Sequence, residues 1–241
     1  MALATTAASP VGASPCPVPK LSAAAVSTPS GVIEDGGGVI VAVINNFGEA
    51  TNGEEVTPTG GAHDGDLVVR SAWRFRGAGK LIAPTIDKIA PGLAVYRPPA
   101  MTMPEYVLET SAHKTVASAR RSADRDASVL GAPVVVGGGE TTFTGRRGGG
   151  ALVTVHLVST PPKGARIMVA YGPDKVARSF GYVDATSKNV LVWRTRSGCE
   201  LGIPGEIPTA VGDKITVAWL DESGRLSARS APIEIKQEKT K

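Results

Sequence analysis

The amino-acid sequence predicts an all-β protein built from two β-sandwich domains in tandem. Glycine and proline are abundant, at 29 and 18 of 241 residues, and they separate many short apolar segments, as is typical of strands joined by tight turns. Aromatic residues make up only 5% of the chain, so we expect cores of Val, Ile, Leu and Ala. An apparent internal repetition favours two domains over one large domain.

The repetition relates a segment in the first half of the chain, at 65–86, to one near its C-terminus, if short insertions and deletions are allowed. Each contains a Gly-Asp pair, a tryptophan, a Gly-basic-Leu triplet and an Ala-Pro pair. The matched residues are Gly65-Asp66 and Gly212-Asp213, Trp73 and Trp219, Gly79-Lys80-Leu81 and Gly224-Arg225-Leu226, and Ala83-Pro84 and Ala231-Pro232. We interpret this pattern as a duplicated β unit, a tandem repeat.

The later segment predicts a β-hairpin. Large apolar and small side chains alternate through 215–219, which is the pattern of a half-buried strand. Asp221-Glu222-Ser223-Gly224 then supply polar side chains and a glycine for a tight turn. The chain is expected to return through Leu226 toward a second strand at Ile233 and Ile235.

This hairpin carries a family resemblance. A strand, Asp-x-x-Gly-x-x-Ser, small residues, Ser-Ala-Pro and a second strand resemble the last two strands of fibronectin type III and related bacterial immunoglobulin-like domains. The residues concerned are Asp221, Gly224, Ser227 and Ser230-Ala231-Pro232. The resemblance implies two immunoglobulin-like or fibronectin-III-like β-sandwich domains, and it implies no catalytic residue.

The N-terminal part divides into a tail and a first domain. Residues 1–30 are mainly Ala, Ser, Thr, Pro and Val with one Lys, so we expect a disordered tail, or an arm that orders against a neighbouring subunit. Residues 31–112 are predicted to form the first β domain, beginning with a buried strand at 39–44. In the strand at 67–75 we expect Phe75 to point inward; the alternative is an exposed edge that stacks a ligand.

The loop at 46–66 contains the metal-binding candidates. It holds several carboxylates and one histidine among glycines, and such oxygen and nitrogen groups can bind calcium or a transition metal. The candidate ligands are His63, Asp64 and Asp66. Their spacing fits no calcium loop that we can specify, and the alternative is a solvated acidic loop. No cofactor is expected.

A linking segment and a second domain complete the chain. At 113–131 small apolar residues recur every three or four positions, which predicts either a linking helix or a charged linker. Residues 132–237 are predicted to form the second β-sandwich domain, and 238–241 a frayed end. His156 alternates with Val155 and Leu157, so we expect it to project from the opposite face of its strand.

Charge, cysteine content and hydropathy narrow the function classes. The net charge of +4 and the isolated pairs Arg120-Arg121 and Arg146-Arg147 argue against nucleic-acid binding, which calls for clustered basic residues with stacking aromatics. Cys16 and Cys199 are far apart, and no disulfide is expected. No apolar run is long enough to span a membrane, and the N-terminus lacks a secretory signal, so the expected location is the cytoplasm or an assembled particle.

The sequence therefore favours a non-enzymatic structural or binding β-sandwich protein, a component of a self-assembling particle or surface structure. Its partners would be another protein or copies of itself. No catalytic motif such as Gly-x-Ser-x-Gly, His-Glu-x-x-His or a P-loop is present. Two alternatives remain open: a metal-dependent hydrolase or carbohydrate-active protein with its site in the acidic loop at 49–66, and a regulatory protein that masks a partner.

Overall fold

The computed structural model describes ten stretches of the chain, and all of their regular secondary structure is β. The stretches are residues 20–25, 32–33, 37–46, 54–56, 73–98, 105–109, 115–121, 130–145, 148–194 and 211–238. The strands are β1 (Lys20–Ala25), β2 (Val32–Ile33), β3 (Val39–Asn46), β4 (Glu54–Val56), β5 (Arg74–Gly77), β6 (Lys80–Ile82), β7 (Thr85–Ala90), β8 (Leu93–Arg97), β9 (Glu105–Glu109), β10 (Thr115–Arg121), β11 (Val135–Gly145), β12 (Gly148–Leu157), β13 (Ala165–Tyr171), β14 (Ala177–Tyr182), β15 (Asn189–Arg194), β16 (Lys214–Asp221) and β17 (Ile233–Glu238).

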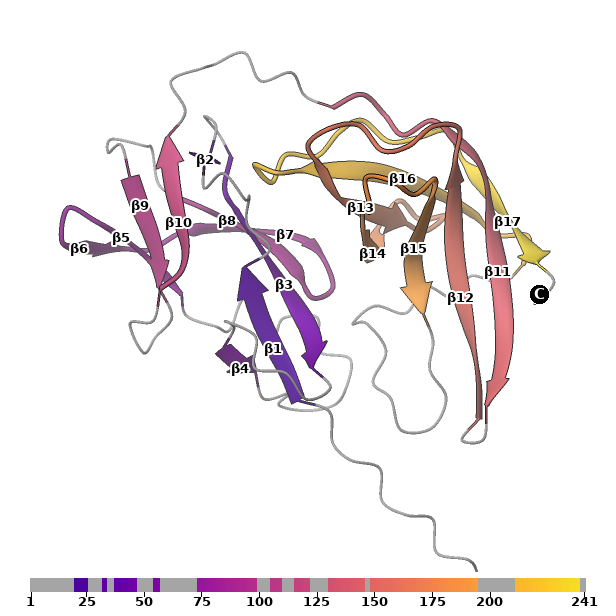
Figure 1. Ribbon diagram of the computed structural model, residues 1–241, viewed down its shortest axis with the longest axis horizontal. Coiled ribbons are helices and arrows are strands. Elements are labelled where there is room, and N and C mark those ends of the chain that lie inside the picture. Colours follow the sequence, from indigo (N-terminus) through magenta and orange to yellow (C-terminus); the bar gives the residue numbers. More distant parts are fainter. Residues whose placement is uncertain are drawn as a thin grey trace, which may run out of the picture.

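The strands form three sheets, and the chain separates into two halves (Figure 1). In the first half, residues 20–121, one five-stranded sheet has the order β4-β1-β3-β8-β7 and another has the order β2-β10-β9-β5-β6. In the second half, residues 130–238, a seven-stranded sheet has the order β14-β13-β16-β17-β11-β12-β15. The predicted all-β class is confirmed, and the predicted strands at 39–44 and 215–219 lie within β3 and β16.

Aromatic side chains fill the first half. Trp73, Phe75 and Tyr106 are almost fully buried. The ring of Trp73 lies 5.9 Å from that of Tyr96 on β8, between centroids, and the Phe75 ring meets the Tyr106 ring edge-on at 6.0 Å. Phe75 therefore points inward, as alternation along the strand predicted.

The seven-stranded sheet curls until its two flanks face each other. Side chains of β12 and β15 share one hydrophobic core with those of β13, β16 and β17. The terminal strands β14 and β15 also meet, because the Ser179 hydroxyl donates a hydrogen bond to the Val192 carbonyl at 2.5 Å. Gly181 allows this approach, since a side chain there would collide with the Leu191 backbone.

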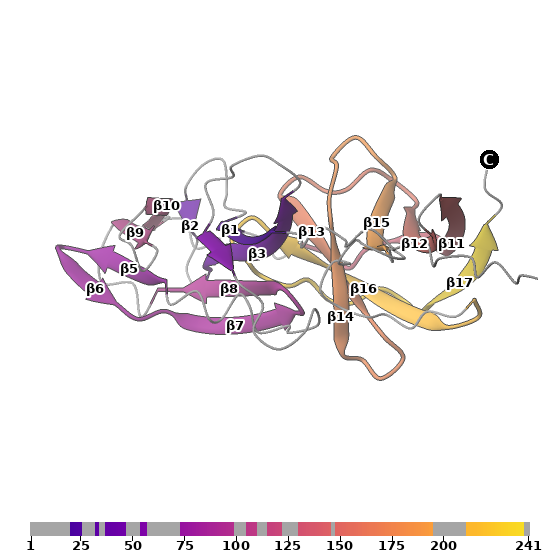
Figure 2. The same ribbon diagram turned by 90° about the horizontal axis from the view of Figure 1, so that it is seen from below.

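A second core joins the two halves. Residues of β3 and β8 pack against the face of β13 and β16 that points away from the first core. Its members are Ile40, Ala42, Leu93, Val95, Ile167, Val169, Tyr171, Phe180, Ala218 and Leu220. Both views place β3 and β8 beside β13 (Figure 2), so β13 is buried on both faces.

The structure corrects the predicted helix. Thr115–Arg121, the start of the segment 113–131, forms β10, which pairs antiparallel with β9 and parallel with β2. The helix would have buried only a narrow stripe of small residues, whereas the strand pairs its backbone groups on both sides. Residues 122–129 lie outside the described part of the chain.

The predicted tail at 1–30 also contains a strand. Lys20–Ala25 forms β1, which pairs with β3 and β4. The small residues of this segment suggested disorder, but backbone pairing with the apolar β3 does not depend on large side chains. No helix in the described ranges is long and apolar enough to span a bilayer.

Candidate functional site

The sequence-predicted metal candidates cannot be placed. His63, Asp64 and Asp66 lie outside the described residues, and of the acidic loop only Glu54–Val56 is described, as β4 paired with β1. Within the part of the chain that the structure describes, no group of three or more His, Cys, Asp or Glu side chains is arranged to hold a metal ion. The metal-binding hypothesis for the loop stays a prediction.

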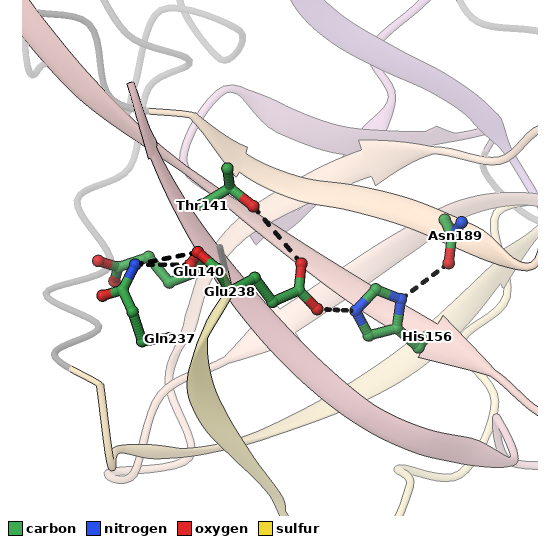
Figure 3. Close-up of polar contacts among 6 residues, drawn as sticks. All are labelled: Glu140, Thr141, His156, Asn189, Gln237 and Glu238. Atoms are coloured by element: carbon green, nitrogen blue, oxygen red, sulfur yellow. Dashed lines mark hydrogen bonds and ion pairs between the residues drawn. The ribbon is translucent and has the colours of Figure 1, made fainter. Parts of the chain in front are cut away.

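The structure brings together a different set of polar side chains, on the outer face of the second half (Figure 3). We call Thr141, His156, Asn189 and Glu238 the polar cluster. His156 Nε2 lies 2.6 Å from Glu238 Oε1 and His156 Nδ1 lies 2.8 Å from Asn189 Oδ1. The Thr141 hydroxyl donates to Glu238 Oε2 at 3.4 Å. The cluster thus crosses four neighbouring strands, β17, β11, β12 and β15.

Local sequence explains why His156 is available. Val155 and Leu157 are buried in the core of the second half, so His156 between them must project outward. This orientation was predicted, but its partners were not. Glu238 is 82 residues away along the chain, and only the parallel pairing of β17 with β11 brings it close.

Gly139 makes the contact possible. It lies on β11 between the strands that carry Glu238 and His156, and a Cβ atom there would collide with the Glu238 carboxylate. The whole run Gly137-Gly138-Gly139 is part of strand β11. Gln237 holds the same strand end, because its Nε2 donates to the Glu140 carbonyl at 3.0 Å.

The polar cluster is a cross-strand network of side-chain hydrogen bonds. Oxygen atoms of Asn189 and Glu238 face the two ring nitrogens of His156. The Thr141 hydroxyl donates to the Glu238 carboxylate at 3.4 Å, which is a long hydrogen bond. With 32% and 39% of the His156 and Glu238 side chains exposed, such a pair contributes about 0.2–1 kcal/mol to stability.

Arg76, which follows Phe75 in the sequence, has a side-chain partner on β9. Arg76 forms a bidentate pair with Glu109, with Nε to Oε1 at 2.7 Å and Nη2 to Oε2 at 3.0 Å. The hydrogen bond to Glu109 raises the pKa of Arg76 above its ordinary value. Because the Phe75 ring is buried, it cannot stack a ligand in this arrangement. Of the two basic pairs in the sequence, Arg120-Arg121 lies at the end of β10 and Arg146-Arg147 lies outside the described residues. Both cysteines also lie outside them.

Comparison with known proteins yields little. No family model matches the chain, and no curated protein matches it. A solved structure described as "Biofilm associated protein - BSP domain" aligns with 91% of this chain at 10% sequence identity and a TM-score of 0.25. The aligned part is 29% of that structure's chain. A TM-score this low does not establish a common fold.

Proposed function

We propose that the chain is a non-enzymatic structural or binding protein, a component of a self-assembling particle or surface structure whose partners are other proteins or copies of itself. The observation that supports this proposal is the core shared by the two halves. Ile167 and Val169 of β13 pack against Ile40 and Val95 of the first half. Such a core resists relative motion of the halves, because packed interiors do not deform continuously.

A fixed stack of sheets suits a protein that presents its surface loops and strand edges to a partner. Alternate residues of β13 belong to the two cores. Met168 and Ala170 lie in the core of the second half, and Ile167 and Val169 lie in the core shared by both halves. A strand used in this way has no face left for a ligand. We therefore place contacts with partners on the outer sheets and the loops.

We further propose that residues 132–237 form a fibronectin-III-like β-sandwich. The strand order β14-β13-β16-β17 followed by β11-β12-β15 supports this assignment. One flank would be a four-stranded sheet and the other a three-stranded sheet, joined where β17 runs parallel to β11. Residues 31–112 would form most of the first β domain, which β1 extends at its N-terminal side and β10 at its C-terminal side.

Light scattering of the purified chain tests the proposal. We expect a concentration-dependent mass above the 24.7 kDa of one chain, and a smaller mass when residues 1–19 are removed. The truncation stops at Pro19 so that β1 is kept. A single-chain mass for both proteins at all concentrations would contradict self-assembly. Divalent metal that raises the melting temperature would instead favour the alternative of a metal site in the acidic loop.

A further inference from the structure

The turn between β16 and β17 reaches from the second half into the first. The backbone N–H of Gly38, just before β3, donates to the Ser223 carbonyl at 2.7 Å. On β8, the Arg97 Nη2 donates to the Gly224 carbonyl at 3.0 Å. We call these residues, together with Val95, the joint.

The position of Gly224 favours glycine over any other residue. Its φ of +71° belongs to the left-handed region, and a Cβ atom there would lie 2.6 Å from Val95 Cγ1 and 3.0 Å from Val95 Cγ2. Any side chain would therefore be strained and would also push against the first half. The turn and β8 approach each other as closely as a glycine allows.

Each side of the joint is held in place by its own half. The buried Asp221 carboxylate accepts hydrogen bonds from the Ser223 N–H at 2.9 Å and the Arg225 N–H at 2.8 Å, which fixes the turn. Across the joint, Arg97 Nε lies 2.5 Å from Asp87 Oδ2 on β7. Arg97 thus spans from its own sheet to the turn of the other half.

We infer that the joint, together with the shared core, makes the two halves one cooperative unit with a fixed relative orientation. The hydrophobic core supplies attraction without direction. The two hydrogen bonds and the glycine contact are directional, and they accept one arrangement of the turn on β3 and β8. This inference does not depend on the proposed function, since it concerns the coupling of the halves and not their partners.

The inference can be tested with a full-length chain that is cut between its two halves after it has folded. A site-specific protease sequence is inserted within residues 122–129, the folded protein is cut, and the fragments are analysed by size-exclusion chromatography. The cut wild-type chain is expected to elute as one species that contains both fragments. Gly224→Ala is expected to weaken their association by roughly tenfold or more, and Arg97→Ala by roughly fivefold.

Two further variants separate the joint from local turn strain. Gly212→Ala is the matched control, because Gly212 lies in the same half with a φ of +101° and, among the described residues, has no atom within 4 Å of where its Cβ would be; its fragments should stay together. Val95→Ala in the Gly224→Ala background makes room across the joint and should restore part of the association.

Heating the uncut proteins gives an independent measurement. The wild type should unfold in one transition, and Gly224→Ala should broaden or divide that transition. The inference is overturned if the wild-type fragments separate on cutting, if Gly212→Ala and Gly224→Ala weaken association equally, or if the uncut wild type unfolds in two steps.

Discussion

Gly79 and Gly224 occupy corresponding places in the two segments predicted to be copies, and their surroundings differ. Both have positive φ, at 77° and 71°, and each is followed by a basic residue and a leucine. Gly79 lies in a two-residue hairpin turn between β5 and β6, and among the described residues no atom lies within 4 Å of where its Cβ would be. Gly224 lies in a longer turn, where a Cβ would press against Val95 of the other half.

The chain also continues differently after each turn. After β6, Ala83-Pro84 carries it from one five-stranded sheet to the other. After Gly224 it stays along β16, where the Ser227 N–H donates to the Trp219 carbonyl and the Ser227 hydroxyl accepts from the Trp219 N–H, both at 2.9 Å. Ser230 repeats this pattern with Val217, at 2.8 and 3.0 Å.

A turn signal in the sequence therefore specifies a turn but not what the turn contacts. Glycine permits the left-handed conformation in both places, but within the described residues only Gly224 lies against a strand of the other half. The duplication itself remains a prediction, because the earlier segment is described only from Trp73 onward.

The two tryptophans should contribute equally to the free energy of unfolding. Trp73 and Trp219 are 0% and 3% exposed, so Trp73→Ala and Trp219→Ala should each lower the free energy of unfolding by about 3–5 kcal/mol. Urea denaturation measures both. Leu81→Ala, at a side chain 50% exposed, is the control and should change little. A Trp73→Ala effect near that of the control would mean that the two positions are not equivalent.

The hydroxyls of Ser227 and Ser230 should stabilise the later segment, and the earlier segment has no counterpart to them. There, Ile82 and Ala83 follow the Gly-Lys-Leu triplet. Ser227→Ala leaves the Trp219 N–H without its hydroxyl acceptor, and Ser230→Ala does the same to Val217. Each should cost about 1–3 kcal/mol of unfolding free energy. Hydrogen exchange should also accelerate at these two amides, whereas Ser187→Ala in an exposed loop should leave them unchanged.

The two glycines should differ in the size of their effect. Gly79→Ala introduces only the left-handed strain of an alanine, about 1 kcal/mol. Gly224→Ala adds the collision with Val95 and should cost clearly more. Thermal unfolding of both variants under identical conditions measures the difference. Equal losses would show that the Val95 contact relaxes without cost.

One substitution in the earlier turn should stabilise the protein. Ala78 has a φ of +44° next to Gly79 at +77°, and two successive positive values define a turn that prefers Asn-Gly. Ala78→Asn should therefore raise the free energy of unfolding by about 0.5 kcal/mol, since asparagine tolerates this conformation better than alanine. A lower melting temperature than that of the wild type would contradict this account of the turn.

Much of the local structure follows from the sequence alone. Alternation placed Phe75 inward and His156 outward, and the residues Asp221 to Gly224 specified the turn before β17, because these features depend on near neighbours and on the steric limits of each residue. The continuous apolar run at 39–44 also indicated a buried strand, although not that it packs against the second half.

Tertiary structure alone decided the rest. Thr115–Arg121 is a strand because β9 lies beside it, and local propensity toward a helix is too weak to outweigh such pairing. The contact of His156 with Glu238 and that of Gly224 with Val95 join residues distant in the sequence. No periodicity encodes such contacts, because they depend on which strands pair and which sheets stack, and those choices are settled only when the whole chain has buried its apolar faces.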